Sequence, residues 1–501
     1  MQKVTIIGGG LAGMTAALRL LERGFRVSIY ESATRLGGKA GANKNGDEFN
    51  DHGYHIFPEW YVNTWQLVDE LGIRNNFVDL EDISELRAGK FPSFATLRSI
   101  TSLKYAWRNL TSGFMPIPDM FLFFYAVLDI ASQPYQLRLP LDHTSVAGFL
   151  NSRFYATRGL EQRLEEVILK AITVPSYDVS AMTVRKVMRF WIKYPSPFVR
   201  IVRGNLQTYF IEPFQHKLQE LGCEIHFSKR LVRLQTKDSR ITQLQFMDQT
   251  TQKLELTESD IVILAIPPEQ VVKLLDDELY AAAPDLSKIL YLQSQPMVAL
   301  DIFLTRKIKE LPQEHVNLAG TKLGLSFIDI SGTWEGHDTT TLNVIASDFN
   351  SVRTLSDQKA VDLLIEELRR YVPFEKAEIS KYVFQPHREE PLFLNTDGAW
   401  HFRPKTSTEL SNLYLAGDYC RSYVDLTCME AAVSSGLIAA EAVRLAAGDS
   451  RPVENKKPDE PAQWLLILAK FILIPIAALA VLIIRLRGRN SPPHALSRFD
   501  R

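Results

Sequence analysis

Three glycines and one acid near the N-terminus have the types and spacing of a dinucleotide-binding site. Gly8, Gly10 and Gly13 form a G-x-G-x-x-G turn, and Glu31 follows 18 residues after the last glycine. The first glycine permits a tight turn, the second lets the backbone approach a pyrophosphate, and the third allows a helix to pack closely on a strand. The acid can accept the hydroxyls of an adenosine ribose. A glycine-rich structural turn would account for the glycines but not for Glu31, so the pattern predicts a bound dinucleotide.

The elements expected around these residues fit the same role. An apolar strand over 4–7 precedes the turn, an alanine-rich helix over 14–21 follows it, and a second strand over 26–30 ends at the acid. Backbone N–H groups at the start of this helix, including those of Leu11 and Ala12, would face the phosphates. We also include Ser32, which follows the acid, in the predicted site.

Two further segments hold more than an NAD site needs. The first comes directly after the second strand and places two glycines between two cations: Arg35, Gly37, Gly38 and Lys39. The second is a buried strand that ends in Gly417-Asp418 and is followed by a helix that opens at Met429. The partial positive charge at the start of that helix favours an anionic group such as a reduced flavin.

With these motifs the sequence resembles the FAD-dependent amine oxidoreductase superfamily, whose FAD fingerprint continues into an R-x-G-G-[RK] segment. Within it, the sequence is similar to the plant- and cyanobacterial-type carotenoid (phytoene) desaturase branch, which includes hydroxysqualene dehydroxylase-like proteins. The resemblance implies FAD as the cofactor. It also implies that Gly417 and Asp418 contact the pyrophosphate and ribityl chain, and that Leu231 or Val232 meets the adenine through its backbone.

The segment 50–58 resembles the Gly-Leu-His-Ile-Phe-Phe run of those desaturases, which implies that Gly53, Tyr54 and His55 lie close to the flavin. His55 is a candidate acid–base group, and a hydrogen-bonded structural histidine is the alternative. His52 and His55 are spaced i, i+3, as in some metal sites. No third ligand lies nearby in the sequence, so we expect no metal and expect the flavin itself to carry the redox step.

A chain of 501 residues is longer than one ordinary core, which predicts two joined domains. We expect an α/β fold in which a Rossmann-like FAD-binding domain, of the glutathione reductase and amine oxidase type, is interleaved with a mixed α+β substrate domain. The FAD-binding domain is predicted to comprise 1–58, 204–275 and 411–447. The substrate domain is predicted to comprise 59–203 and 280–410.

The C-terminal part is expected to contact a membrane. A linker over 448–461 is followed by a predicted anchor and basic tail over 462–501. The apolar run 464–484 matches the bilayer hydrocarbon thickness, but Lys470 and Pro475 interrupt it. A spanning helix would also carry the arginine-rich tail across, against the positive-inside tendency. We therefore favour a monotopic or re-entrant segment with both ends on the cytosolic side. A single span and a buried core helix are the alternatives.

Charge and apolar segments elsewhere in the chain restrict the kinds of partner and the location that we expect for it. The net charge of −1 argues against nucleic acid. The nucleotide strand begins by residue 3 or 4 and leaves no room for a cleaved signal peptide, so we expect the catalytic body on the cytoplasmic side. The apolar stretch 114–128 is too short to span a bilayer. A core helix is favoured for it, and an apolar lip around a lipid entrance is the alternative.

These observations favour a membrane-associated FAD-dependent oxidoreductase that desaturates or otherwise redox-modifies a long apolar isoprenoid, carotenoid or squalene-like, by hydride transfer to flavin N5. Its expected partners are this lipid, the membrane and an electron acceptor, either a quinone or oxygen. An amine-oxidase-like enzyme for a small polar substrate is an alternative, and it would need an aromatic cage for which Tyr419 and Tyr423 are candidates. A flavin-stabilised membrane scaffold without turnover is an alternative of another class.

Overall fold

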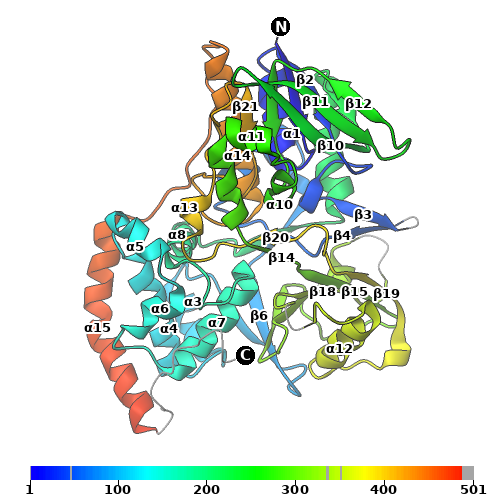
Figure 1. The fold of residues 1–501 in the computed structure, drawn as a ribbon. Helices are drawn as coiled ribbons and strands as arrows, with labels where there is room; N and C mark the ends of the chain where they lie inside the picture. Colours follow the sequence, from blue (N-terminus) through cyan, green and yellow to red (C-terminus); the bar gives the residue numbers. More distant parts are fainter. Residues whose placement is uncertain (1, 46–47, 335–337, 350–351, 488–501) are drawn as a thin grey trace.

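A five-stranded parallel sheet lies in the upper part of the molecule in the computed structural model, which describes residues 2–45, 48–334, 338–349 and 352–487 (Figure 1). Its strand order is β21 (Leu413–Leu415), β13 (Ile261–Leu264), β1 (Lys3–Ile7), β2 (Arg26–Tyr30) and β9 (Glu224–His226). Every residue of β13 is buried, as expected for a parallel strand covered on both faces. The sheet takes its strands from three distant pieces of the chain, and all of them fall within the ranges predicted for the FAD-binding domain.

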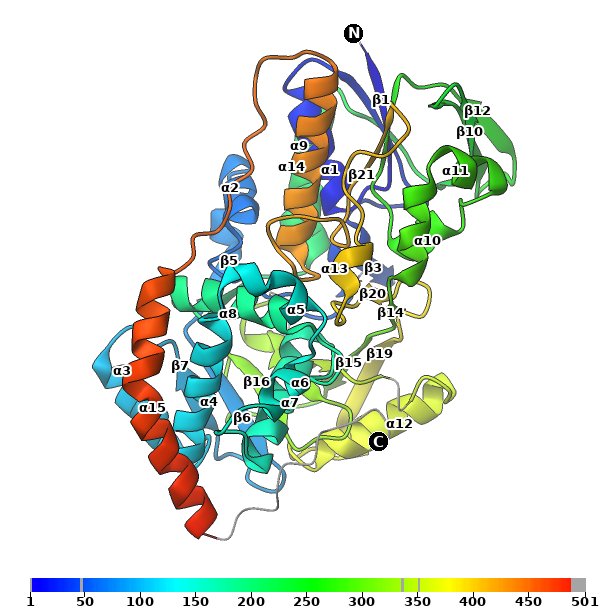
Figure 2. The same ribbon diagram turned by 60° about the vertical axis from the view of Figure 1, so that its left-hand side comes forward.

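Helices and a second sheet cover this parallel sheet. Helix α1 (Leu11–Leu21) packs against both α14 (Met429–Ala446) and α9 (Glu212–Glu220), as Figure 2 shows. A three-stranded antiparallel sheet of β10 (Lys229–Lys237), β11 (Arg240–Asp248) and β12 (Leu254–Thr257) shares a separate apolar core with β1, β2 and β13. In that core the rings of Tyr30 and Phe246 stack with centroids 4.2 Å apart.

A seven-stranded mixed sheet forms the second half of the molecule. Its order is β19 (Ile379–Gln385), β15 (Val298–Leu304), β18 (Thr341–Ala346), β17 (Leu325–Asp329), β16 (His315–Ala319), β6 (Asp82–Arg87) and β7 (Ala95–Arg98). Only the β16–β6 pair is parallel within the described residues. Helix α12 (Asp357–Arg369) buries Ala360, Leu364 and Leu368 in the same core as this sheet.

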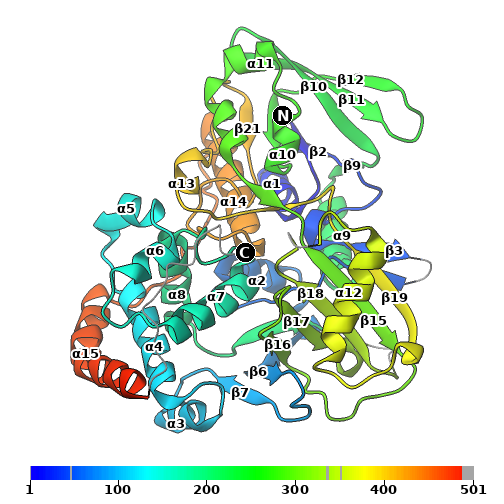
Figure 3. The ribbon, with the colours of Figure 1, turned by 60° about the horizontal axis from the view of Figure 1, so that its bottom comes forward.

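A helical layer stands beside the seven-stranded sheet (Figure 3). It contains α3 (Leu103–Thr111), α4 (Ile117–Ala131), α5 (Arg138–Asp142), α6 (Val146–Asn151), α7 (Arg158–Ile172) and α8 (Ala181–Lys193). The apolar stretch 114–128 therefore forms most of α4, which begins behind Pro116 and buries Met120, Leu122 and Tyr125. This agrees with the core-helix interpretation of that stretch.

The other helices and strands complete the fold. The remaining helices are α2 (Val62–Glu70), α10 (Pro268–Val272), α11 (Asp277–Ala282), α13 (Ala399–Phe402) and α15 (Gln463–Leu486). The remaining strands are β3 (Ala42–Asn45), β4 (Glu48–Asp51), β5 (Phe77–Leu80), β8 (Val199–Val202), β14 (Ser294–Gln295) and β20 (Leu392–Phe393). A π-helical turn over Gln207–Ile211 directly precedes α9.

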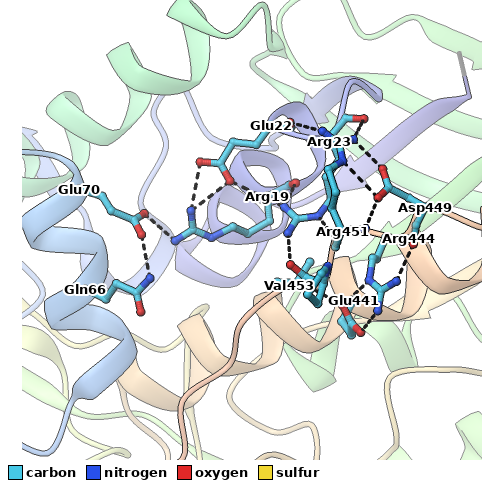
Figure 4. Close-up of polar contacts among 11 residues, drawn as sticks. Arg19, Glu22, Arg23, Gln66, Glu70, Glu441, Arg444, Asp449, Arg451 and Val453 are labelled. Atoms are coloured by element: carbon cyan, nitrogen blue, oxygen red, sulfur yellow. Dashed lines mark hydrogen bonds and ion pairs between the residues drawn. The ribbon is translucent and has the colours of Figure 1, made fainter.

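The predicted linker 448–461 lies against the folded body along its length. Arg451 donates to the Arg23 carbonyl at 2.8 Å, and the Val453 N–H donates to Glu441 at 2.8 Å (Figure 4). At the other end of the segment, Arg189 of α8 donates to the Pro461 carbonyl at 2.8 Å. These polar contacts hold the predicted linker to the turn after α1, to α14 and to α8, so the chain has not left the folded body before the apolar run begins.

Helix α15 itself packs along α4 at the edge of the helical layer (Figures 1 and 2). It is long and apolar enough to cross a membrane by length and composition, and it contains Pro475. Of the predicted anchor and tail 462–501, residues 488–501 lie outside the described part, Arg489 among them.

Candidate FAD site

In the turn between β1 and α1, two glycines are required by close backbone contacts within the fold, whereas the third has open space beside it. A Cβ on Gly8 would lie 2.4 Å from the Ala265 carbonyl oxygen, and Gly8 has a φ of +101°. A Cβ on Gly13 would lie 2.1 Å from the Gly8 carbonyl oxygen. Beside Gly10, by contrast, the nearest atom is the Gly38 Cα at 4.0 Å. The fold therefore leaves space at Gly10, where the motif places a pyrophosphate.

The start of α1 is suited to an anion. Gly10 is its N-cap residue and supplies no side chain, and no acidic residue lies in the first turn. Leu11 and Ala12 are buried at this end of the helix. No side chain of the described residues caps their N–H groups. A phosphate at this position would satisfy those donors and interact favourably with the helix dipole.

Glu31 lies at the end of β2 and contacts the glycine turn. Its Oε2 accepts from the Gly9 N–H at 2.7 Å, and its Oε1 accepts from the Ala33 N–H at 2.8 Å and the Ser32 hydroxyl at 3.1 Å. A carboxylate offers about four acceptor positions, so one remains for a ribose hydroxyl. Glu31 therefore stabilises the turn and keeps one acceptor position for the predicted ribose contact, rather than the two that both hydroxyls would need.

The Arg35–Lys39 segment packs directly on the first turn. The Gly37 N–H donates to the Gly9 carbonyl at 2.8 Å, and Gly37 and Gly38 have φ values of +111° and +54°. Arg35 donates to the Gly38 carbonyl at 3.3 Å, and Lys39 donates to the Pro391 carbonyl at 2.5 Å. Both cations thus hold backbone carbonyls in place around the turn, a role that the sequence did not indicate.

The C-terminal motif meets the N-terminal one across the α1–α14 contact. A Cβ on Gly436 would lie 2.3 Å from the Ala12 carbonyl oxygen, so this glycine lets the two helices touch. Gly417 has a φ of +152°, and its N–H donates to the Ser435 hydroxyl at 2.9 Å. Met429 is the first residue of α14, whose N-terminus has no side-chain cap. The structure therefore brings together the two glycine motifs that lie at opposite ends of the chain.

Arg403 is a contributor that sequence reasoning missed. Its buried guanidinium donates to the carbonyls of Asp418, Tyr419 and Cys420, at 2.9, 3.0 and 2.6 Å. Three consecutive carbonyls are thereby fixed directly after Gly417. No local pattern around Arg403 signals this role, because the contact depends on how two loops fold together.

Glu430 is a second residue whose structural role the sequence did not indicate. It is fully buried in the first turn of α14 and accepts from Asn63 N and Nδ2, at 3.0 and 2.8 Å, and from Thr64 N and Oγ1, at 2.9 and 2.7 Å. These donors belong to the first turn of α2, so one carboxylate caps another helix while standing at the start of its own. Burial raises the pKa of Glu430 to about 7, and the four hydrogen bonds act against that rise.

The predicted adenine contact lies on β10. Leu231 pairs with Phe246 and Arg233 pairs with Gln245, so Val232 is skipped in the ladder. The bulge leaves the Val232 backbone without a cross-strand partner in β11, while the Leu231 side chain is buried in the core. A free backbone edge at Val232 is what the implied contact with adenine requires.

The predicted flavin-side segment packs against the seven-stranded sheet. Gly53 has a φ of +116°, and a Cβ there would lie 3.1 Å from Ile345. The Tyr54 hydroxyl bonds to Ser326 at 2.6 Å and to His315 at 2.7 Å. His55 Nδ1 lies 2.9 Å from the Gly53 carbonyl, and burial lowers the pKa of His55 to about 4, with His52 adding to the effect. A neutral, half-buried His55 is a weak base that the backbone holds in position.

The two tyrosines considered for an aromatic cage lie in different surroundings. Tyr419 is fully buried in the apolar core that joins the parallel and antiparallel sheets, whereas the Tyr423 side chain is partly exposed. Within the described residues, no ring contact joins them. This arrangement offers no support for an amine-oxidase cage built from Tyr419 and Tyr423.

The comparison with known families decides the class of cofactor. A family model described as flavin containing amine oxidoreductase matches residues 11–444. The chain belongs to this family. It is accordingly an FAD-dependent oxidoreductase, and the space at Gly10, the uncapped start of α1 and the free edge at Val232 fit FAD. When bound, FAD would supply the redox chemistry, and the residues described above are those predicted to hold it.

Carotenoid desaturases are among the relatives that align with most of this chain. The chain is 25% identical over 466 residues to the chloroplastic/chromoplastic 15-cis-phytoene desaturase of Glycine max, covering 88% of this chain and 79% of the relative. It is 21% identical over 486 residues to the zeta-carotene desaturase of Synechocystis sp., covering 88% and 97%.

Solved structures agree on the fold. Putrescine oxidase bound to putrescine has a TM-score of 0.68 at 15% identity, covering 89% of this chain and 99% of that one. An oxidoreductase from Methanosarcina mazei has a TM-score of 0.63 at 16% identity, covering 87% and 99%. This likeness shows an amine-oxidase-like FAD-binding α/β fold with mixed sheets. The division into domains and the contacts of individual site residues with FAD remain predictions.

Proposed function

We propose that this oxidoreductase is membrane-associated and acts on a long apolar isoprenoid, carotenoid or squalene-like, by transfer of a hydride from substrate carbon to flavin N5. The similarity to 15-cis-phytoene and zeta-carotene desaturases supports the substrate class. The observation that carries the proposal is the placement of α15, because it presents a long apolar surface beside the helices predicted to bind the substrate.

Helix α15 has two different sides. One side packs on the protein and buries small and apolar residues: Leu466, Ala477, Ala480, Val481 and Ile484. The other side is exposed and carries large apolar residues: Trp464, Leu465, Leu468, Phe471, Ile472, Leu479, Leu482 and Leu486. A contiguous apolar surface of this kind marks a membrane or protein contact. We assign it to a lipid surface, because the substrate class we propose dissolves in bilayers.

The docking of α15 along α4 favours a monotopic arrangement over a single span. A helix that crosses a bilayer would separate from the body, whereas the contacts of 448–461 and of α4 hold this one alongside it. The exposed side would then enter one leaflet, as amphipathic interfacial helices do. We propose that the catalytic body lies on the cytoplasmic side and takes its substrate from that leaflet.

The proposed reaction needs little acid–base help from the protein. Bound FAD would supply the hydride acceptor, and the proton of the substrate would leave to water or to a nearby base. His55 is the sequence candidate for that base, and its lowered pKa makes it a weak one. A quinone or oxygen would serve as the electron acceptor that restores oxidised FAD.

Lipid extraction of the purified protein tests the substrate class. We expect a polyene or polyprenyl lipid to co-purify with the yellow, FAD-loaded protein in roughly stoichiometric amounts. An FAD-loaded protein that carries no isoprenoid, and whose flavin a small amine reduces, would contradict the proposal.

A further inference from the structure

We propose that His52, His387 and Glu390 form a binding site for a divalent transition-metal ion. The nitrogen or oxygen ligand atoms of the three residues all lie within 4.8 Å of one another. His52 follows β4 directly, and the other two residues lie in the segment between β19 and β20. The third ligand that the sequence did not reveal near His52 is therefore supplied by a distant part of the chain.

The hydrogen bonds of His52 leave a ligand position facing Glu390. Its Nδ1 lies 3.0 Å from the Gly41 carbonyl, which can only accept, so Nδ1 carries a proton. Its Nε2 lies 2.7 Å from Glu390 Oε2, and an ionised carboxylate also only accepts. Two acceptors cannot face each other at this distance, so in this structure a proton on Nε2 lies between them. A metal ion at the site would replace that proton.

His387 repeats the same arrangement. Its imidazole bonds to the backbone of His52, and its Nε2 is buried without a partner in the described part of the chain. The bonded nitrogen is therefore Nδ1, and Nε2 keeps a free lone pair. Histidine ligands of metals generally donate their other ring N–H to a backbone carbonyl or carboxylate, which fixes the tautomer. Both histidines here meet that condition before any ion binds.

The types of the three ligands and the exposure of Glu390 fit a divalent ion of the first transition-metal row. Two imidazoles and one carboxylate are ligands of Zn²⁺, which takes four positions, so a water would complete the site. Ligand atoms of a tetrahedral zinc lie roughly 3.3 Å apart, so His52 and Glu390 need to separate slightly and His387 needs to approach. The Glu390 side chain is 50% exposed, which gives the ion an entry path.

Arg35 is the neighbouring cation that could compete for Glu390. It interacts electrostatically with Glu390, but its guanidinium donates to the carbonyls of Leu36 and Gly38 and to Asn43. The carboxylate is therefore left to His52. The competing account is a plain ion pair between Glu390 and a protonated His52, with His387 uninvolved.

An ion at this site would act by positioning. The segment that holds His387 and Glu390 continues into Pro391, whose carbonyl accepts from Lys39 of the glycine-rich segment. His52 precedes Gly53, Tyr54 and His55 of the flavin-side segment. The ion would thus join two loops that border the FAD site, and this role does not depend on the identity of the substrate.

Zinc binding to the FAD-loaded protein tests the site. The protein is stripped with a chelator, dialysed against Zn²⁺, and its metal content is measured by mass spectrometry, with affinity from calorimetry. We compare the wild type with His387→Gln and Glu390→Gln. His216→Gln, on an exposed histidine of α9, is the matched control. Flavin absorbance and melting temperature report whether each variant is folded.

We expect one Zn²⁺ per chain in the wild type and in His216→Gln. Each of the two ligand variants should bind more than about 100-fold more weakly, because even second-shell substitutions cost 10–100-fold. Added Zn²⁺ should raise the melting temperature of the wild type and of His216→Gln, and should leave that of the two ligand variants unchanged. A wild type that takes up no Zn²⁺, or folded ligand variants that bind it as tightly as the wild type, would overturn the proposal in favour of the ion pair.

Discussion

Lys470 Nζ lies 2.6 Å from Asp129 Oδ1, and this ion pair joins the middle of α15 to α4. Asp129 is buried and also accepts from the Tyr155 hydroxyl at 2.7 Å, with Arg153 at 3.2 Å. The single charge within the apolar run 464–484 is therefore turned inward, and the exposed side of α15 carries no charge from that run. The pair makes α15 part of the folded body and explains why a lysine interrupts the run.

Lys470→Ala should loosen α15. The substitution leaves a buried carboxylate with one partner fewer, at a cost of about 1.5–3 kcal/mol, which Arg153 and Tyr155 partly offset. We expect faster hydrogen exchange over 463–486 with unchanged FAD content. Lys457→Ala, which removes an exposed cation paired only at 3.6 Å with Glu460, is the control and should change little. Equal exchange in all three proteins would show that the pair does not hold the helix.

Phe471→Asp should reduce membrane binding. This side chain is 62% exposed on the outward side of α15, where a carboxylate would have to enter the lipid. We expect at least about a tenfold loss of vesicle binding in a flotation assay, from a penalty of over about 1.4 kcal/mol. Leu254→Asp makes a similar change at a 55% exposed site on β12 and should bind vesicles normally. Equal loss in both variants, or in neither, would contradict the assigned surface.

Gly10→Ala and Gly13→Ala should separate ligand binding from folding. Gly10 has a φ of −75° and space for a methyl group, so alanine there should change stability by less than about 0.5 kcal/mol. FAD affinity should nevertheless fall at least about tenfold, because the methyl group occupies the space of the pyrophosphate. Gly13→Ala should destabilise the chain by about 1–3 kcal/mol or more, since its Cβ meets a backbone oxygen. Thermal unfolding and flavin titration distinguish the two. Full FAD affinity in Gly10→Ala would place the pyrophosphate elsewhere.

Asp301→Asn should remove a pH dependence of stability. Burial raises the pKa of Asp301 to about 7, with a hydrogen bond from Asn50 acting against it, whereas the unfolded value is about 4. Between these values the folded state holds more protons, so this group lowers stability as pH rises through that window, by at most about 4 kcal/mol. From about pH 5 to about pH 8 the melting temperature of the wild type should therefore fall more than that of Asp301→Asn. Parallel curves would show that Asp301 is ionised throughout.

The parts of the site that follow one another in sequence were predictable. The strand, the glycine turn, the start of α1 and Glu31 all lie within one short stretch, and local spacing determines their geometry. The strand at Leu413–Leu415 and the opening of α14 at Met429 were recognisable for the same reason. Their meeting through Gly436 and Ala12 follows from the parallel sheet, because both motifs sit at the carboxyl ends of β21 and β1, which are separated only by β13.

What the sequence could not show depends on contacts between distant segments. Arg403, Glu430 and the pairing of His52 with Glu390 each join pieces of chain that only the fold brings together. The same holds for Arg35 and Lys39, whose charges suggested phosphates although their donors meet backbone carbonyls. Composition identified 464–484 as apolar. Which side of α15 is buried could not be predicted, because it depends on where α4 packs against it.

The most direct test of the proposed function is reduction of the bound flavin by substrate without oxygen. The FAD-loaded protein is mixed anaerobically with liposomes that contain 15-cis-phytoene, and in parallel with putrescine, while the visible flavin absorption is followed. We predict that the flavin bleaches in the presence of the polyene and stays oxidised with the amine. Bleaching by putrescine, with an unchanged spectrum in the phytoene liposomes, would contradict an isoprenoid oxidoreductase.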